Sequence, residues 1–231
     1  HWTWPFYALL YVPAWLASST GMLSFSNALF YWGVLIGPLL FAATVLTMLW
    51  ALDPLLKRGE RFNATLFLLM SAGVLLGFQV ARPDHQALSL WLLAFGLGLA
   101  IRLLENPRSE RRAVLLGLAM AAGIWVSVEG ILFIGIVQLG FMATWLFHRL
   151  DRAPFGAMMA NAYAAVAVLI FLIIQEATLW PWNIMADQMS IIHFKLLMAI
   201  FWAWLLIAAE ASWPSSSSHF LKWILLSIGA K

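Results

Sequence analysis

The feature that most constrains this chain is a series of long apolar runs, separated by short loops that carry most of the charges. Runs of about 20 apolar residues are long enough to cross the hydrocarbon core of a bilayer as helices. Of the 231 residues, 64% are apolar and only 10% are charged, whereas soluble domains carry about 25% charged residues. The sequence therefore predicts a polytopic membrane protein, and it excludes an ordinary soluble domain or a disordered chain.

The apolar runs predict an all-α fold, a polytopic transmembrane helical bundle with about seven full spans. A first run, Pro5 to Ala17, contains Pro13 and is too short to cross about 30 Å of hydrocarbon, so we expect it to lie in the membrane interface. A last helix, from His219 onward, is truncated at Lys231. Residues 1–231 are expected to form a single transmembrane helical domain that is part of a longer chain. The full spans are expected at Ala28–Leu52, Ala64–Ala81, Ala87–Leu104, Ala113–Val126, Ile131–Leu150, Gly156–Gln175 and Ile191–Ala211.

The charges alternate from loop to loop along the chain. Because positively charged loops stay in the cytoplasm, the basic loops are expected there, with Asp84 and Glu129 on the extracytoplasmic side. The 13 Lys and Arg residues are therefore interpreted as determinants of topology, and the expected partners are membrane lipids and no nucleic acid. The basic loops carry Lys57, Arg58, Arg61, Arg108, Arg111, Arg112, Arg149 and Arg152, and the opposite loops carry Arg82, Asp84, Glu129, Glu176 and Asp187.

The residue types that are missing narrow the possible chemistry. The chain has no cysteine, which excludes disulfides, zinc–thiolate sites and iron–sulfur clusters within it. The sequence contains no glycine-rich phosphate loop, no Ser-His-Asp set and no HExxH zinc motif. A transporter would be expected to show internal repeats or paired broken helices, and no convincing repeat is present.

Asp84 and His85 follow Arg82 and Pro83 in the tightest predicted extracytoplasmic turn. In one interpretation Asp84 only caps the helix that follows, because a carboxylate satisfies the free N–H groups at a helix start. In the other, Asp84 is a ligand of Mg²⁺ or Mn²⁺ and His85 is a second ligand or a base, since hard cations prefer carboxylate oxygens. The sequence leaves both interpretations open.

Glu129 interrupts a pair of strongly apolar helices and is followed by Gly130. An acid in such a place is costly unless it faces water, protein or a cation. It is therefore either an ordinary residue at the tip of a helical hairpin or part of a site on the extracytoplasmic side.

Three segments, His1–Pro5, Ala81–Leu88 and Val126–Gly130, occur in an order and at intervals that resemble a known family. Together they resemble the bacterial membrane glycosyltransferases of the GT-C superfamily that are related to oligosaccharyltransferase catalytic subunits. The resemblance covers roughly residues 1–150. It implies transfer of a sugar from a polyprenyl-phosphate-linked donor at the extracytoplasmic face of the bacterial inner membrane, usually with a divalent metal.

The resemblance also implies roles for individual residues. Asp84 matches the metal-associated Asp of the family and would hold Mg²⁺ or Mn²⁺, and His85 matches the His that follows it. The implied substrate-binding residues are Arg82, His1 and Trp2, and Glu129 is implied as an acceptor-side catalytic base. His1 would lie on the same side as Asp84 if the first apolar run does not cross the membrane.

The chain departs from the family pattern at several positions. Pro83 replaces a β-branched residue, Gln86 replaces a second His, Ser89 replaces a Gln and Trp4 replaces an Arg. The other catalytic Asp of the family would lie upstream of His1. A non-catalytic structural or accessory subunit, which packs on other membrane subunits, is therefore the alternative to an active transferase.

Overall fold

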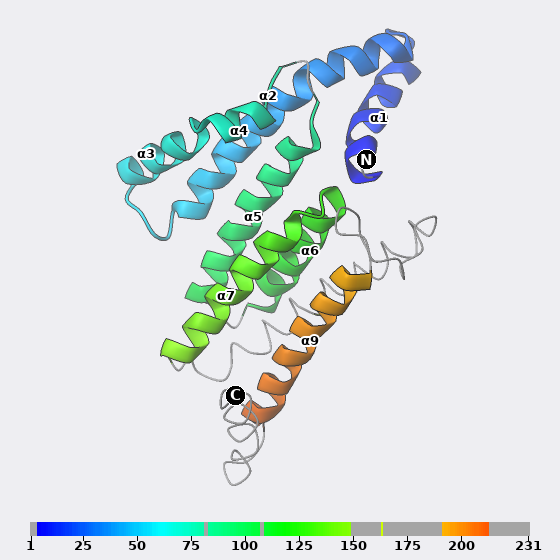
Figure 1. Cartoon of the computed structure of the whole chain (residues 1–231). Coiled ribbons are helices and arrows are strands. Elements are labelled where there is room, and N and C mark those ends of the chain that lie inside the picture. The colour runs from blue at the N-terminus through cyan, green and yellow to red at the C-terminus, as the bar shows by residue number, and fades with distance from the viewer. Residues whose placement is uncertain (1–3, 81–82, 107–108, 149–162, 164–190, 213–231) are drawn as a thin grey trace.

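The computed structural model of this chain describes residues 4–80, 83–106, 109–148, 163 and 191–212 (Figure 1). In these ranges every regular element is a helix and no strand is present, which confirms the all-α class. The helices are α1 (Trp4–Ser19), α2 (Phe25–Leu52), α3 (Arg58–Leu69), α4 (Ala72–Gly77), α5 (His85–Glu105), α6 (Glu110–Val126), α7 (Gly130–His148) and α9 (Ile191–Ser212).

Two of these helices, α2 and α5, are long and apolar enough to cross a membrane, with 28 and 21 residues. Shorter apolar helices cover Gly130–Thr144 and Ile192–Leu206. These findings support membrane association, whereas the arrangement of seven full spans stays a prediction. The expected span at Gly156–Gln175 and the helix from His219 onward lie outside the described residues.

The predicted span Ala64–Ala81 is wrong as one continuous helix, because α3 ends at Leu69 and α4 begins only at Ala72. Ser71 has an extended backbone, with φ −64° and ψ 136°, and the chain leaves the helix again after Gly77. The extended stretch after α4 packs closely on α2, since a Cβ added to Gly37 would lie 3.0 Å from the carbonyl oxygen of Gln79. Contact with α2 therefore stabilises a chain path that apolar composition does not predict.

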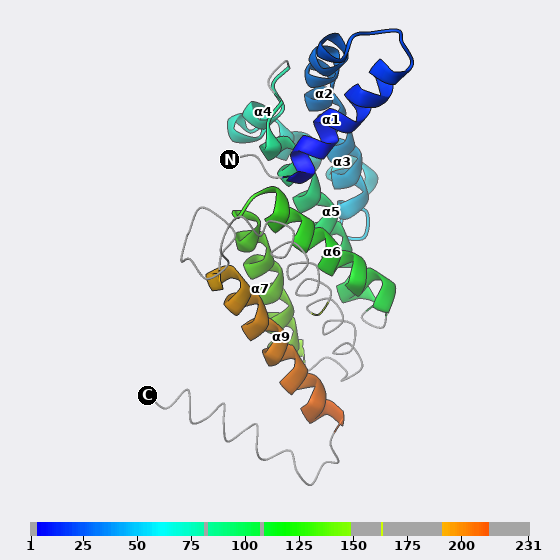
Figure 2. The ribbon, with the colours of Figure 1, turned by 90° about the vertical axis from the view of Figure 1, so that its right-hand side faces the viewer.

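The first helix, α1, has 16 residues and contains Pro13. Its length is about 24 Å, shorter than the roughly 30 Å hydrocarbon core. It packs antiparallel to the first part of α2, and the indole N–H of Trp32 donates to the Leu9 carbonyl at 2.8 Å. Figures 1 and 2 show this hairpin at one end of the molecule and α9 at the other. That α1 does not cross the membrane stays a prediction.

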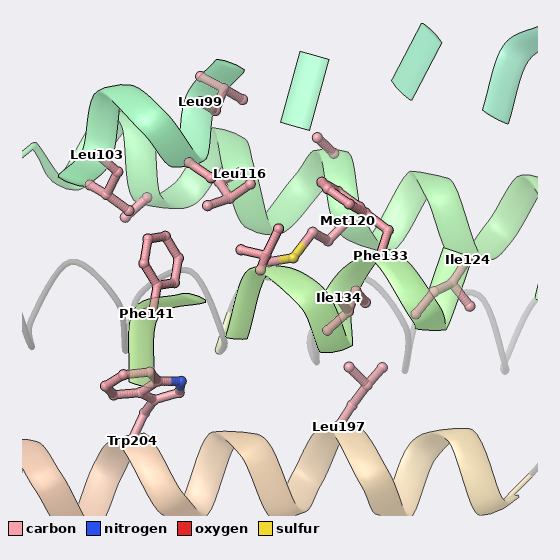
Figure 3. Close-up of a cluster of buried hydrophobic side chains, with 14 residues drawn as sticks. Leu99, Leu103, Leu116, Met120, Ile124, Phe133, Ile134, Phe141, Leu197 and Trp204 are labelled. Carbon is pink, nitrogen blue, oxygen red and sulfur yellow. The ribbon is translucent and has the colours of Figure 1, made fainter. Parts of the chain in front are cut away.

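Helix α5 lies in the centre and packs on α2 on one side and on α6 on the other. A larger apolar cluster joins α5, α6, α7 and α9, and Figure 3 shows Phe141, Met120 and Trp204 from three of these helices within it. A smaller cluster joins α1, α2, the start of α5 and the end of α6. The predicted site residues that the structure describes, Asp84, His85 and Glu129, lie next to segments that contribute to the smaller cluster.

One buried hydrogen bond joins α7 to α9 inside the larger cluster. The Trp204 indole N–H donates to Gln138 Oε1 at 2.6 Å, and the two side chains are 2% and 7% exposed. Burial of a polar group is unfavourable unless it is paired, so this bond selects one register of α9 against α7.

We expect Gln138→Leu to destabilise the fold by about 1–3 kcal/mol, because it leaves the buried indole N–H without this acceptor. Unfolding of the purified protein in SDS, followed by circular dichroism, measures the effect. A double-mutant cycle with Trp204→Phe should give a coupling energy of about 1 kcal/mol. Strictly additive effects would show that the bond does not stabilise the α7–α9 contact.

Candidate functional site

Three segments that are distant in the sequence meet at one end of the bundle: the start of α1, the start of α5 and the turn between α6 and α7. Phe6, Ala87 and Val126, one from each segment, belong to the same buried cluster. Figures 1 and 2 both show the α6–α7 turn close to the starts of α1 and α5. The residues at this end of the bundle are called here the α5-start site: Asp84, His85 and the side chains that pack around them.

Asp84 precedes α5 and acts as its N-cap. Its backbone is extended, with φ −125° and ψ 135°, and its Oδ1 accepts a hydrogen bond from the Gln86 N–H at 3.1 Å. Among the described residues no hydrogen bond reaches its second oxygen, Oδ2. The capping interpretation is therefore correct for Oδ1.

His85 is the first residue of α5 and lies between Asp84 and α1. Its Nδ1 is 3.0 Å from Asp84 Oδ1, although the pair is not aligned as a hydrogen bond. Phe6 packs against the imidazole with its ring nearly perpendicular and its centroid 6.4 Å away. These contacts hold the imidazole beside the carboxylate, where it can orient Asp84 or exchange a proton nearby.

Glu129 lies at the exposed tip of the α6–α7 turn. The turn is closed by hydrogen bonds from the Gly130 N–H to the Ser127 carbonyl at 2.9 Å and from the Leu132 N–H to the Glu129 carbonyl at 3.0 Å. In the described part of the chain Glu129 makes no ion pair or hydrogen bond with Asp84 or His85. It thus shares the end of the bundle with them without direct contact.

Three of the predicted substrate-binding residues, Arg82, His1 and Trp2, lie outside the described residues. Within the described ranges no three His, Asp or Glu side chains come together in a way that could hold a metal ion. Asp84 and His85, the two candidate ligands from the sequence, are both described, and by themselves they form only a pair.

The structure adds an apolar hollow that the sequence analysis missed. It has a volume of about 270 Å³ and lies between α2 and the chain just before Asp84. Five of its residues recur at the spacing of one helix face, which is the signal that could have revealed it. The hollow is lined by Ser26, Leu29, Phe30, Gly33, Val34 and Pro83.

Positive charge gathers at the opposite end of α5. The Arg102 guanidinium donates from Nη2 to the Trp50 carbonyl at 2.6 Å and lies 4.0 Å from the centroid of the Trp50 ring. Arg112 in turn donates to the main-chain carbonyl of Arg102 at 2.9 Å. Asp84 and Arg112, which the sequence assigns to opposite loops, lie next to opposite ends of α5, a helix about 30 Å long.

Comparisons of the chain with protein-family models, with curated proteins and with solved structures gave no match. The geometry of the α5-start site is thus the basis for a functional proposal.

Proposed function

We propose that this protein is a membrane-embedded glycosyltransferase of the GT-C type, which takes a sugar from a polyprenyl-phosphate-linked donor at the extracytoplasmic face of a bacterial inner membrane. The observation that carries the proposal is the meeting of Asp84 and His85 with the start of α1 and the α6–α7 turn. These are the same three regions in which the sequence resembles that superfamily.

The apolar hollow beside Pro83 supports a lipid-linked donor rather than a water-soluble one. Its walls are mainly hydrocarbon, and it is formed by α2, one of the two helices that are long and apolar enough to cross a membrane. Its volume of about 270 Å³ approaches the range of small-molecule sites, about 300–1,000 Å³. Pro83, which lines the hollow, is the residue before Asp84 in the chain.

A divalent cation is the cofactor that this reaction class implies, and Mg²⁺ or Mn²⁺ is proposed. The described residues by themselves do not form a complete metal site, because Asp84 supplies only one carboxylate. Its Oδ2 is the atom available for a cation, and further oxygen ligands would have to come from water, the donor phosphate or other parts of the protein. When bound, such a cation would neutralise charge on the phosphate leaving group.

The remaining roles follow from position. His85 would orient the Asp84 carboxylate, which it contacts at 3.0 Å. Arg82 would add positive charge for the donor phosphate, and His1 and Trp2 would contribute to substrate binding. Glu129 would serve as a base on the acceptor side, where its exposed position leaves it in reach of an incoming acceptor.

The proposal is tested by reconstituting the full-length protein into liposomes with a labelled polyprenyl-phosphate-linked sugar and candidate acceptors. Release of the sugar that depends on added Mg²⁺ or Mn²⁺, above the rate in protein-free liposomes, supports the transferase. Absence of release with every donor and both metals would contradict it.

A second candidate function is a structural or accessory subunit of a larger membrane complex. It is favoured by the use of Asp84 Oδ1 as a helix cap, which gives the carboxylate a structural role that needs no ligand. Co-purification of a stoichiometric membrane partner with an inactive full-length protein would support this second function.

The proposed orientation can be tested directly because the chain has no cysteine of its own. We expect Glu129→Cys to react with a membrane-impermeant maleimide in intact spheroplasts, and Lys57→Cys to react only after permeabilisation, because basic loops stay in the cytoplasm. Both side chains are exposed, so a difference in labelling reflects the side of the membrane and not burial within the protein. Labelling of both positions from the same side would contradict the orientation.

A further inference from the structure

A second place that can bind a ligand lies at the far end of α5 from Asp84. It is centred on Arg102, whose guanidinium lies 4.0 Å from the centroid of the Trp50 ring and donates a hydrogen bond to the Trp50 carbonyl. Trp50 is near the end of α2, and Arg102 is near the end of α5. In the described part of the chain, α2 and α5 are the two helices long enough to cross a membrane. The guanidinium lies near the last turns of both helices, so it is at the depth at which these apolar spans end.

The Arg102 guanidinium forms no ion pair with any described residue. Its Nη1 is shielded from water and has no hydrogen-bond partner among them. Glu105 and Arg112 are the charged groups that act on it, but Glu105 makes no ion pair with it within 4.0 Å in the described ranges. Arg112 adds a second positive charge, and its own Nη1 bonds to a main-chain carbonyl rather than to an acid.

A guanidinium has five N–H donors in a planar fork, and that fork fits two oxygens of a phosphate. A positive charge left unpaired near the hydrocarbon core is costly, and an anion that reaches it repays the cost. Basic pockets between membrane helices on the cytoplasmic side are typical places for anionic headgroups. The exposed Arg111 beside Arg112 extends the positive charge outward from the helix ends.

We propose that Arg102 and Arg112 bind the phosphate headgroup of an anionic phospholipid where α2 and α5 end and α6 begins. The Trp50 ring keeps the Arg102 guanidinium in place, and Arg102 and Arg112 together favour a headgroup with net negative charge over a zwitterionic one. This site is separate from the α5-start site and does not depend on the transferase activity.

The test is native mass spectrometry of the full-length protein with phosphatidylglycerol and with phosphatidylcholine of the same acyl chains. We expect the wild type to retain the anionic lipid about tenfold better or more, and Arg102→Gln and Arg112→Gln each to lose most of this preference. Arg58→Gln is the matched control, because it removes an exposed arginine at the start of α3 that makes no described ion pair. The control should keep the preference within about twofold.

Three results would overturn the proposal. The first is no preference of the wild type for the anionic lipid, a result that does not depend on any variant folding. The second is an equal loss in Arg58→Gln, which would show general attraction to the positive surface. The third is displacement of the lipid by millimolar inorganic phosphate, which would assign the site to a soluble anion instead. The lipid retention of Arg102→Gln is used only if this variant elutes as a single species like the wild type. The lipid retention of Arg112→Gln tests the same site with a second, independent variant.

Discussion

Asp84→Asn is expected to lower sugar transfer by about two orders of magnitude or more while leaving the fold unchanged. Asn caps a helix about as well as Asp, and its side-chain oxygen can still accept the Gln86 N–H that Asp84 now accepts at 3.1 Å. The neutral amide is a weaker ligand for a hard cation than a carboxylate, and it lacks the negative charge that the proposed reaction would use. A large loss of activity without a loss of stability would therefore assign a chemical role to the carboxylate.

The measurement is transfer of a labelled sugar from a polyprenyl-linked donor by the wild type and the variant at matched expression. Asp53→Asn is a suitable control. Asp53 is an exposed carboxylate at the C-terminal end of α2, and it pairs with Arg61. Asp84→Ala should lose the same activity and also about 1 kcal/mol of stability, because the cap is removed. Equal activity of the wild type and Asp84→Asn would eliminate Asp84 as a catalytic residue.

Gly130→Ala is expected to destabilise the protein by about 2–3 kcal/mol. Gly130 begins α7 where that helix crosses the backbone of α6, and a Cβ there would lie 2.6 Å from the carbonyl carbon of Gly123 and 2.7 Å from the Ile124 nitrogen. These neighbours are main-chain atoms, which cannot move aside as a side chain can. The two helices would have to separate, and the α6–α7 turn that carries Glu129 would shift with them.

Gly135→Ala is the matched control on the same helix. A Cβ at Gly135 meets no atom within 4 Å, so this substitution should be neutral or stabilise α7 by up to about 1 kcal/mol. Unfolding in SDS, followed by the helical circular dichroism signal, compares the two variants. If Gly130→Ala were as stable as Gly135→Ala, the close crossing of α6 and α7 would be wrong.

Several helix positions were predictable from the sequence because their causes are local. The expected span Ala28–Leu52 lies within α2, and the expected span Ala87–Leu104 lies within α5. In both, an apolar run is bounded by polar residues, and for α5 the cap at Asp84 is a property of the chain next to the helix. That the acidic and basic loops lie on opposite sides of a membrane stays a prediction.

The break of the helix at Met70 and Ser71 was not predictable from hydropathy, because the apolar run continues on both sides of it. After α4, the stretch at Phe78 and Gln79 packs closely on Gly37 of α2. The surroundings of the candidate site were hidden because they depend on contacts between helices. Phe6 packs on His85 only after α1 folds back on α2, and Trp50 meets Arg102 across 52 positions of sequence. Apolar runs indicate which segments can be helical, but any apolar face can pack against several others. The choice among those partners depends on small residues that permit close contact and on single polar pairs that must be satisfied, and these become visible only in the packed bundle.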